Sequence, residues 1–288
     1  ALTPTMADLA LRALQTWTDV TGLTFVQTQG AADITFTADP DQPGADAYSD
    51  SVVSNGTILS SIVNIDQDWL DSQGSTLFSY TFQTYIHEIG HALGLGHAGN
   101  YNGNATYGVD NSALNDSWQM TVMSYFSQSE NTYISDTYAY IFTPMMADIY
   151  AIAQMYGLAS TLRTGNTTYG EKSTAGGTYD LFSPTNTDAD EDTTIAVTIA
   201  DHGGLDTLDF RSDTADQRID MRAGSVSDVY GDMGTLSIAL GTVIETVLAG
   251  RGSDSVTGNE AANRIEGGLG NDRLLGEAGA DTLYGGDG

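Results

Sequence analysis

The C-terminal end of the chain repeats every nine residues, and this period constrains the fold more than any other feature. Asp254, Asn263, Asp272 and Asp281 are nine residues apart, and an aliphatic residue follows each of them two positions later. A short, fixed period means that each repeat can bury its apolar side chain only against neighbouring repeats. The aliphatic column argues against a disordered Gly/Asp-rich tail, which is the alternative interpretation of such a composition. The sequence therefore predicts an all-β stack of short strands joined by glycine-rich loops.

The part of the chain before Arg163 shows a different pattern, in which helical and strand periodicities alternate. Apolar residues recur at helical spacing in some segments and alternate with polar ones in others. The pattern predicts helices over 4–22, 77–93 and 144–156, and strands over 23–26, 33–37 and 58–65. Mixed helices and strands indicate an α+β fold. Because helical periodicity disappears after Arg163, we expect two domains, residues 1–162 and 163–288.

The charge and composition exclude several classes of protein. The chain carries 38 acidic against nine basic residues, a net charge of −29, and Arg12 is the only basic residue before Arg163. Such a chain would repel a phosphate backbone, so we expect no nucleic-acid partner. No apolar run is long enough for a membrane span. The absence of cysteine rules out disulfides and thiolate ligands, so bound metal is the expected means of stabilising the fold.

Three of the four histidines fall within eleven residues. His87 and His91 are four positions apart on a predicted helix, so both imidazoles project from one face and can share an ion. Gly94 permits a left-handed turn that would bring His97 back towards them. Three neutral imidazoles leave a fourth position for water, which is the pattern of a catalytic zinc site. Glu88 would then be the general base that takes a proton from the water and delivers it to the leaving amine.

The run His-Glu-x-x-His-x-x-Gly-x-x-His is the metzincin signature, which also requires a downstream methionine turn. Met123 lies downstream of His97 and would form an apolar floor under the zinc ligands. Tyr125 follows two positions later, where its phenol could reach the metal. We therefore predict a metzincin zinc endopeptidase.

On these residues the chain resembles the serralysins, the secreted alkaline metalloproteases of Gram-negative bacteria. Its most specific similarities, besides the zinc run, are Met123-Ser124-Tyr125, the helix from Asp148 to Gly157, and Arg163-Thr164-Gly165. Matrixins and astacins are the near alternatives. Matrixins usually place Tyr-Pro directly after the methionine, and astacins usually carry Glu where Ala98 stands.

The resemblance implies a role for Tyr125 and a calcium-binding second domain. Tyr125 would be a further zinc ligand at rest, would swing away when substrate binds, and would then hydrogen-bond the oxyanion. The second domain would be a parallel β-roll of RTX repeats, in which one turn spans two repeats and oxygen ligands bind Ca²⁺. The implied calcium ligands are Arg163, Gly165, Thr167, Asp201, Gly203, Gly204, Asp206, Glu245, Gly250, Gly252, Asp254, Gly267, Gly268, Gly270, Asp272, Gly279 and Asp281.

The resemblance also implies the setting in which the protein acts. It predicts protein and peptide substrates, bound along an edge strand within about 45–51, and a monomer. It also predicts type I export to the extracellular space and a proteinaceous protease inhibitor as a further partner. Serralysins continue at both ends beyond what this chain contains, so we expect a piece of a longer protein with its C-terminal domain truncated. The alternative function is a secreted calcium-binding adhesin or scaffold with an inert protease domain.

Overall fold

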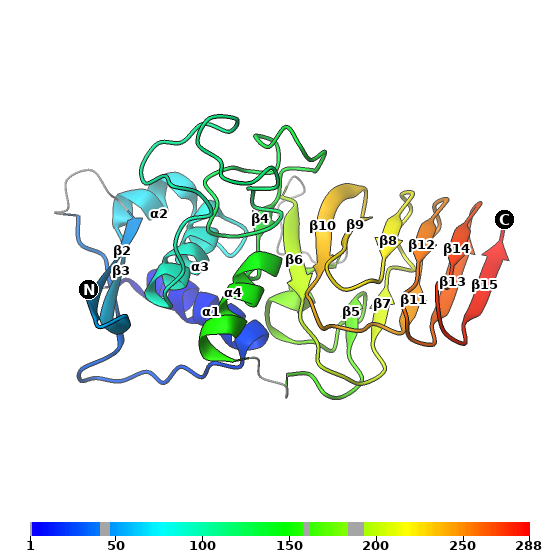
Figure 1. Ribbon diagram of the computed structural model, residues 1–288, viewed down its shortest axis with the longest axis horizontal. Coiled ribbons are helices and arrows are strands. Elements are labelled where there is room, and N and C mark those ends of the chain that lie inside the picture. The colour runs from blue at the N-terminus through cyan, green and yellow to red at the C-terminus, as the bar shows by residue number, and fades with distance from the viewer. Residues whose placement is uncertain (1, 41–46, 158–161, 184–192) are drawn as a thin grey trace.

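The computed structural model describes residues 2–40, 47–157, 162–183 and 193–288. Figure 1 shows an elongated molecule with the helices gathered in its N-terminal part and a regular stack of strands leading to the C-terminus. In the described residues no helix is long and apolar enough to cross a membrane.

The first helix, α1 (Pro4–Thr21), begins and ends where the sequence predicts. The Thr3 side chain accepts a hydrogen bond from the amide of Met6, and Gly22 closes the helix in a left-handed conformation with φ of 72°. The apolar face of the helix packs on the helix that carries the zinc motif. Trp17 is fully buried there and its indole nitrogen donates to the carbonyl oxygen of Ile86 at 3.1 Å.

A three-stranded sheet follows, with β1 (Ile34–Thr37), β2 (Ala47–Ser54) and β3 (Thr57–Ile65) in the order β1-β3-β2. The central strand pairs in parallel with β1 and antiparallel with β2. The predicted strand over 23–26 is wrong. That segment is irregular and Val26 is 86% exposed, because no strand of the described residues pairs with it and a single extended segment is not stable alone.

Three further helices complete the N-terminal part. They are α2 (Gln67–Gln73), α3 (Tyr80–Ala92) and α4 (Met146–Tyr156). The last two are the predicted second and third helices, each starting two or three residues later than expected. Helix α4 starts at Met146 because the carboxylate of Asp148 accepts the amide of Met145, which fixes the first turn.

The C-terminal part consists of two facing sheets. Among the described residues, the first sheet has seven strands and the second has five. In the second sheet, Val247 pairs with Ile265 and Ile265 with Leu283, so the chain advances by two repeats between parallel neighbours. Val256 and Leu274 show the same step in the first sheet. One turn of the chain therefore spans two nine-residue repeats, which explains the period.

The strands of these two sheets are short, and a 3₁₀ helix, η1 (Gly177–Leu181), also belongs to the C-terminal part. Their bounds are β4 (Tyr140–Ile141), β5 (Thr168–Gly170), β6 (Ile195–Ile199), β7 (Thr207–Asp209), β8 (Arg218–Asp220), β9 (Val226–Val229), β10 (Asp232–Ile238), β11 (Thr246–Leu248), β12 (Ser255–Thr257), β13 (Arg264–Leu269), β14 (Arg273–Leu275) and β15 (Thr282–Asp287). The first sheet has the order β14-β12-β8-β9-β10-β6-β4, and the second has the order β15-β13-β11-β7-β5.

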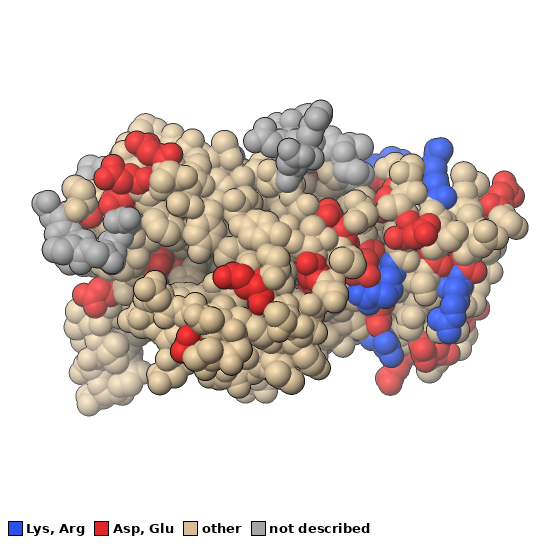
Figure 2. All heavy atoms as spheres, turned by 90° about the horizontal axis from the view of Figure 1, so that it is seen from above, with Lys and Arg blue, Asp and Glu red and all other residues tan. Residues whose placement is uncertain are grey.

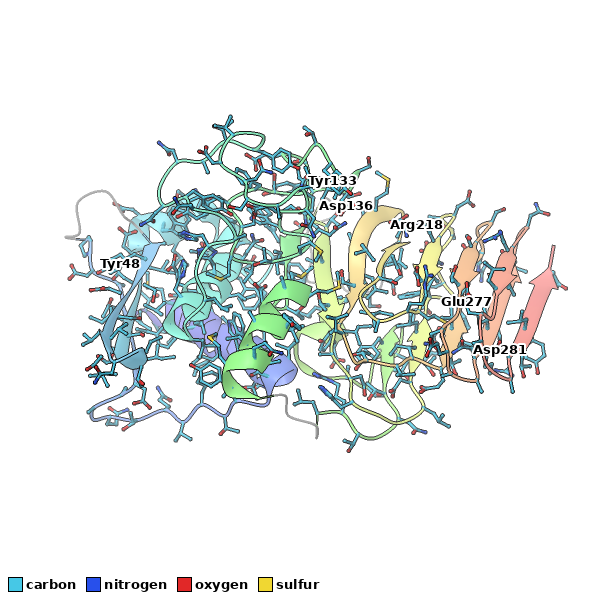
Figure 3. All side chains as sticks on the ribbon, viewed as in Figure 1. Tyr48, Tyr133, Asp136, Arg218, Glu277 and Asp281 are labelled. Carbon is cyan, nitrogen blue, oxygen red and sulfur yellow. The ribbon has the colours of Figure 1, made fainter. Side chains whose placement is uncertain are left out.

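The two parts share a continuous core and a sheet. Strand β4, from the N-terminal part, pairs in parallel with β6. Arg163 links the parts from the other side, because its guanidinium donates to the carbonyl oxygens of Asp19 and Ala200. Asp136 lies at this junction, near the β9–β10 hairpin and Arg218 (Figure 3). The predicted boundary near residue 162 thus falls at an extensive contact.

Charge is distributed unevenly along the molecule. On the face seen in Figure 2, the Lys and Arg side chains gather over the C-terminal part. Arginines of the C-terminal strands pair with acids on the same or adjacent strands, as Arg218 does with Asp228 at 2.7 Å. The N-terminal part, up to Arg163, has Arg12 as its single basic residue in the sequence. Its surface therefore favours cationic over anionic partners.

Candidate active site

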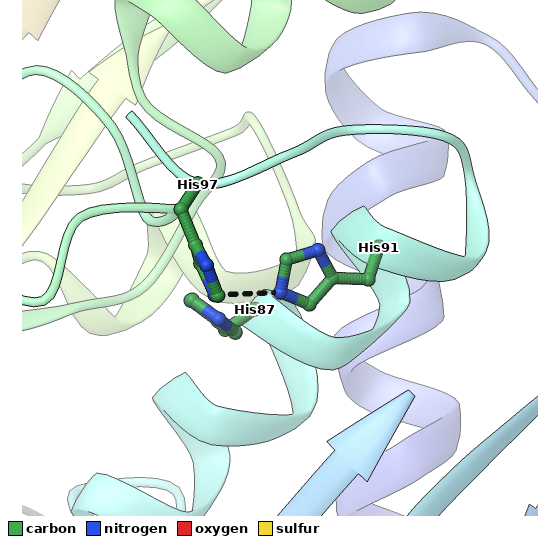
Figure 4. Close-up of side chains that lie close together, drawn as sticks. All are labelled: His87, His91 and His97. Atoms are coloured by element: carbon green, nitrogen blue, oxygen red, sulfur yellow. Dashed lines mark hydrogen bonds between the residues drawn. The ribbon is translucent and has the colours of Figure 1, made fainter. Parts of the chain in front are cut away.

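Helix α3 and the loop after it bring the three predicted histidines together. The possible ligand atoms of His87, His91 and His97 lie within 4.8 Å of one another. His87 and His91 project from one face of α3, and His97 approaches from the loop, as Figure 4 shows. The Nε2 atoms of His91 and His97 are only 3.0 Å apart. Two neutral nitrogen lone pairs at this distance repel each other unless a cation or proton lies between them.

Each imidazole is held by a main-chain carbonyl oxygen. The Nδ1 atom of His87 lies 2.7 Å from Val122 O, that of His91 lies 2.8 Å from Leu95 O, and that of His97 lies 2.8 Å from Tyr101 O. A carbonyl oxygen only accepts, so each Nδ1 carries the proton and each Nε2 keeps its lone pair. Such outer hydrogen bonds orient metal-ligating histidines. The residues fit a metal that prefers three nitrogen ligands.

The bend at Gly94 is what allows His97 to join the helical pair. Gly94 has φ of 105°, and the amide of Leu95 donates to Gly90 O at 2.9 Å. This left-handed geometry favours glycine. The chain therefore reverses immediately after α3, as the sequence predicts.

Glu88 lies beside the histidines but belongs to a different environment. The residue is only 7% exposed, and its Oε2 atom forms no hydrogen bond. Burial raises the pKa of Glu88 to about 8 and lowers that of His87 to about 3. A buried carboxylate with an unpartnered oxygen needs a proton, a water or a cation to satisfy it. This fits a general base rather than a structural acid.

Met123 packs against α3, the helix that carries His87 and His91 and is called the zinc helix below. It is 2% exposed, and its sulfur is the nearest atom to the position that a Cβ on Gly90 would take. The sequence reasoning missed Asp148, which supports this turn. Its fully enclosed carboxylate accepts hydrogen bonds from the Thr121 hydroxyl and the Val122 amide. The available signal was an acid in the first turn of α4, which also suits an ordinary helix cap.

Tyr125 lies next to the histidines in this structure. Its ring centroid is 4.4 Å from that of His97 and 6.2 Å from that of His87. The phenolic oxygen accepts a long hydrogen bond of 3.4 Å from the amide of Gly103. Burial raises the pKa of Tyr125, so the phenol stays protonated and can donate. The geometry therefore places a hydrogen-bond donor beside the histidine site.

The acids implied for calcium upstream of the repeats converge between adjacent loops. Asp201 and Asp206 are fully buried, and Asp206 N donates to Glu245 at 2.8 Å. Asp206 Oδ2 is buried without a hydrogen-bond partner, and burial, together with the charges of Asp201 and Glu245, raises the pKa of Asp206 to about 7. Buried like charges with an unpartnered oxygen fit a cation. Thr167 donates its amide to Asp206 at 2.8 Å.

The repeat loops face each other at the predicted step of two repeats. The amide of Asp254 donates to Asp272 at 3.0 Å, and that of Asn263 donates to Asp281 at 2.9 Å. Asp272 Oδ2 is buried and without a partner.

The other implied calcium ligands lie in these loops or in the loops upstream of them, and several of the glycines among them have positive φ. The positive-φ glycines are Gly203, Gly204, Gly268, Gly270 and Gly279; Gly165, Gly250, Gly252 and Gly267 lack this feature. The Arg163 side chain points to Asp19 and Tyr179, so only its main-chain carbonyl oxygen could bind a cation.

This fold and site define a metzincin-type zinc centre joined to a β-rich C-terminal part. Two family models cover most of the chain, Matrixin over residues 3–107 and Peptidase M10 serralysin C terminal over residues 159–285. A third, Peptidase M66, matches residues 71–151.

Curated relatives agree with these matches. The chain is 38% identical over 261 residues to a serralysin of Photorhabdus luminescens, covering 88% of this chain and 52% of the relative. It is 41% identical over 258 residues to serralysin C of Dickeya chrysanthemi, covering 86% and 52%. It is 37% identical over 272 residues to metallopeptidase AprA of Pseudomonas marginalis, covering 89% and 54%. The chain belongs to the serralysin family, and it spans about half the length of these relatives.

Proposed function

We propose that the protein is a secreted, zinc-dependent endopeptidase with protein and peptide substrates. The observation that carries this proposal is the convergence of three Nε2 lone pairs beside the unpartnered oxygen of buried Glu88. A closed structural zinc site needs no acid beside its ligands, whereas Glu88 lies here in the position of a base. The alternative, an inert scaffold that binds calcium, leaves this arrangement without a purpose.

The chain's own residues supply the other chemical groups needed for peptide hydrolysis. His87, His91 and His97 would hold the metal, which supplies Lewis-acid polarisation of the scissile carbonyl and acidifies the attacking water. Glu88 takes the proton from that water and delivers it to the leaving amine. Tyr125 donates a hydrogen bond to the oxyanion as charge develops on it, and serves as a further ligand at rest.

Substrate would lie along strand β2 as an added antiparallel strand. Among the described residues β2 pairs only with β3, so its other edge is free for main-chain hydrogen bonds. Residues 47–51 of the predicted substrate segment lie on this strand, while Ala45 and Asp46 lie outside the described residues. Recognition of main-chain groups explains broad specificity, since all peptides share them.

The C-terminal part would be a calcium-binding RTX β-roll, with residues 163–288 as its domain. The two-repeat register and the buried unpartnered oxygens of Asp206 and Asp272 support this proposal. Extracellular calcium fills sites of about 10⁻⁴–10⁻³ M affinity, whereas cytosolic calcium does not. The roll would therefore fold after type I export, and the folded monomer would be the species that a proteinaceous inhibitor meets.

A casein digestion separates the two candidate functions. We expect the purified protein in millimolar calcium to degrade casein, zinc removal to abolish the activity, and added zinc to restore it. The Glu88→Gln variant serves as the matched control, since it keeps all three histidines. Unchanged casein with the zinc-loaded protein, together with intact calcium binding, would favour the scaffold.

A further inference from the structure

Asp116 is a buried acid between the third histidine and the methionine turn, and the mechanism above does not use it. It is 3% exposed and lies at the end of the long polar loop after His97. The Ser124 hydroxyl donates to its Oδ1 atom at 2.7 Å. The Tyr101 hydroxyl donates to both carboxylate oxygens, at 3.0 and 3.2 Å. Three hydrogen bonds from two side chains thus converge on one carboxylate.

Both donors belong to segments that carry site residues. Tyr101 accepts a hydrogen bond from His97 on its carbonyl oxygen, and its ring stacks on that imidazole at a centroid distance of 5.5 Å. Ser124 is the residue between Met123 and Tyr125. Asp116 therefore connects Tyr101, which supports His97, to the backbone segment that carries Tyr125.

The Tyr101 ring also limits where Tyr125 can lie. Its centroid is 4.8 Å from that of Tyr125, so the two rings are in contact. The Tyr101 hydroxyl is the donor in both of its hydrogen bonds to Asp116, so the carboxylate fixes the outer end of this ring. Ser124 Oγ also accepts the amide of Phe126 at 3.0 Å, so the backbone is fixed on both sides of Tyr125.

We infer that Asp116 is a positioning residue that sets the place of the Tyr125 phenol relative to the histidine site, by holding Tyr101 and Ser124 on one carboxylate. The inference rests on the proposed function. It differs from a purely structural role because Asp116 acts through Tyr125. A general loss of packing would affect all site residues alike. Loss of positioning would affect only the properties to which the Tyr125 phenol contributes.

A copper-substituted protein tests this without reference to peptidase activity. A phenolate bound to Cu(II) absorbs visible light through ligand-to-metal charge transfer, so the band reports whether Tyr125 reaches the metal. We expect the band in the wild type, its loss in Tyr125→Phe, and a weakened or shifted band in Asp116→Asn. Asp110→Asn is the matched control, because it makes the same change at an exposed acid of the same loop, one that accepts the amide of Thr106. It should leave the band unchanged.

A double-mutant cycle tests the same coupling in the zinc-loaded protein. We expect Asp116→Asn to lower kcat roughly ten- to a hundredfold, with KM little changed, since small misplacements of site groups have effects of this order. In a Tyr125→Phe background the same change should cost less than about twofold, because the phenol is already gone. Tyr101→Phe and Ser124→Ala each remove one donor and should give intermediate losses, which covers the case in which Asp116→Asn folds poorly.

The outcomes distinguish this inference from the proposed function. Equal kcat losses for Asp116→Asn in both backgrounds, or a wild-type copper band in that variant, would overturn the positioning role. A wild type without a copper band would also overturn it, and chelator-sensitive casein cleavage would then still support the peptidase. A normal wild-type band that Asp116→Asn weakens, in a protein that cleaves no peptide, would refute the peptidase and leave the positioning role standing.

Discussion

A Cβ placed on Gly90 would stand 2.6 Å from the sulfur of Met123. The zinc helix and the methionine turn are therefore in direct contact at a position where only a glycine fits. We predict that Gly90→Ala displaces the turn and reduces both zinc affinity and melting temperature. Overpacking of a tight interior typically costs about 1–3 kcal/mol. Zinc titration and thermal unfolding measure the two effects.

The matched control is Gly96→Ala, which adds the same methyl group beside the third ligand. Apart from its two neighbours in the chain, no residue has a heavy atom within 4 Å of the Cβ that it would introduce. We expect zinc affinity within about twofold of the wild type, because the new methyl group meets no other part of the protein. Equal effects of the two substitutions would mean that contact with Met123 is not what matters.

Glu88→Gln should keep zinc bound while kcat falls by several orders of magnitude. Glu88 acts as a base, and removing a positioned base typically costs about 10²–10⁴-fold. Metal content by elemental analysis and kcat on a peptide substrate should be measured on the same sample. If zinc and activity are lost in parallel, Glu88 holds the metal instead.

Tyr125→Phe should weaken catalysis less than Glu88→Gln does. Loss of one oxyanion donor costs about 10²–10³-fold, and three histidines still hold the metal. The phenyl ring keeps its contacts with His97 and Tyr101, so the melting temperature should hardly change. Comparison of kcat/KM for the two variants is the measurement, and a fully active Tyr125→Phe would remove the phenol from the mechanism.

Proline substitutions along β2 should raise KM if substrate adds to its free edge. A proline removes one main-chain donor, so only positions whose amides face away from β3 should affect binding alone. We therefore expect the effect at alternate residues between Tyr48 and Val52, with little change in zinc content. Proline in the middle of β3, at Ile62, is the control that should unfold the sheet. A scan of β2 that leaves KM unchanged throughout would contradict this binding mode.

Asn263→Asp should destabilise the roll, although it restores the acid that the repeat pattern prefers. The Asn263 amide nitrogen donates to Asn259 Oδ1 at 3.0 Å, and its oxygen accepts the amide of Asn259 at 2.8 Å. An Asp would bring two oxygens together in a site that is 2% exposed. In chelator we expect the melting temperature to fall by about 2–10 °C, because a buried polar group left without a hydrogen bond destabilises the fold by about 1–3 kcal/mol.

Asn271→Asp provides the control for this change. It is the same substitution in the next loop, where the side chain is exposed, so its melting temperature in chelator should match the wild type. Millimolar calcium should recover part of the stability lost in Asn263→Asp, because a cation can neutralise the added charge. A higher melting temperature for Asn263→Asp in chelator would show that the Asn259–Asn263 pair contributes nothing.

Local spacing accounts for the parts of this protein that could be predicted from its sequence. Two histidines four residues apart must share a helix face, Gly94 permits the reversal, and a nine-residue period requires stacked repeats. These are consequences of backbone geometry over short stretches of chain, and sequence patterns report such geometry directly. The grouping of the histidines and the stacking of the repeats follow from them, and the structure shows both. The two-repeat step was implied by the family resemblance rather than by the period alone.

Tertiary structure alone decided which distant groups meet. Residues 23–26 have the composition of a strand but find no partner among the described strands, whereas Asp148 supports the turn before Met123 and Asp116 joins Tyr101 to Ser124. An isolated Asp in a sequence suits a helix cap, a loop or a buried network equally well. Its role depends on which donors surround it after folding, and those donors come from segments whose separation along the chain carries no periodic signal.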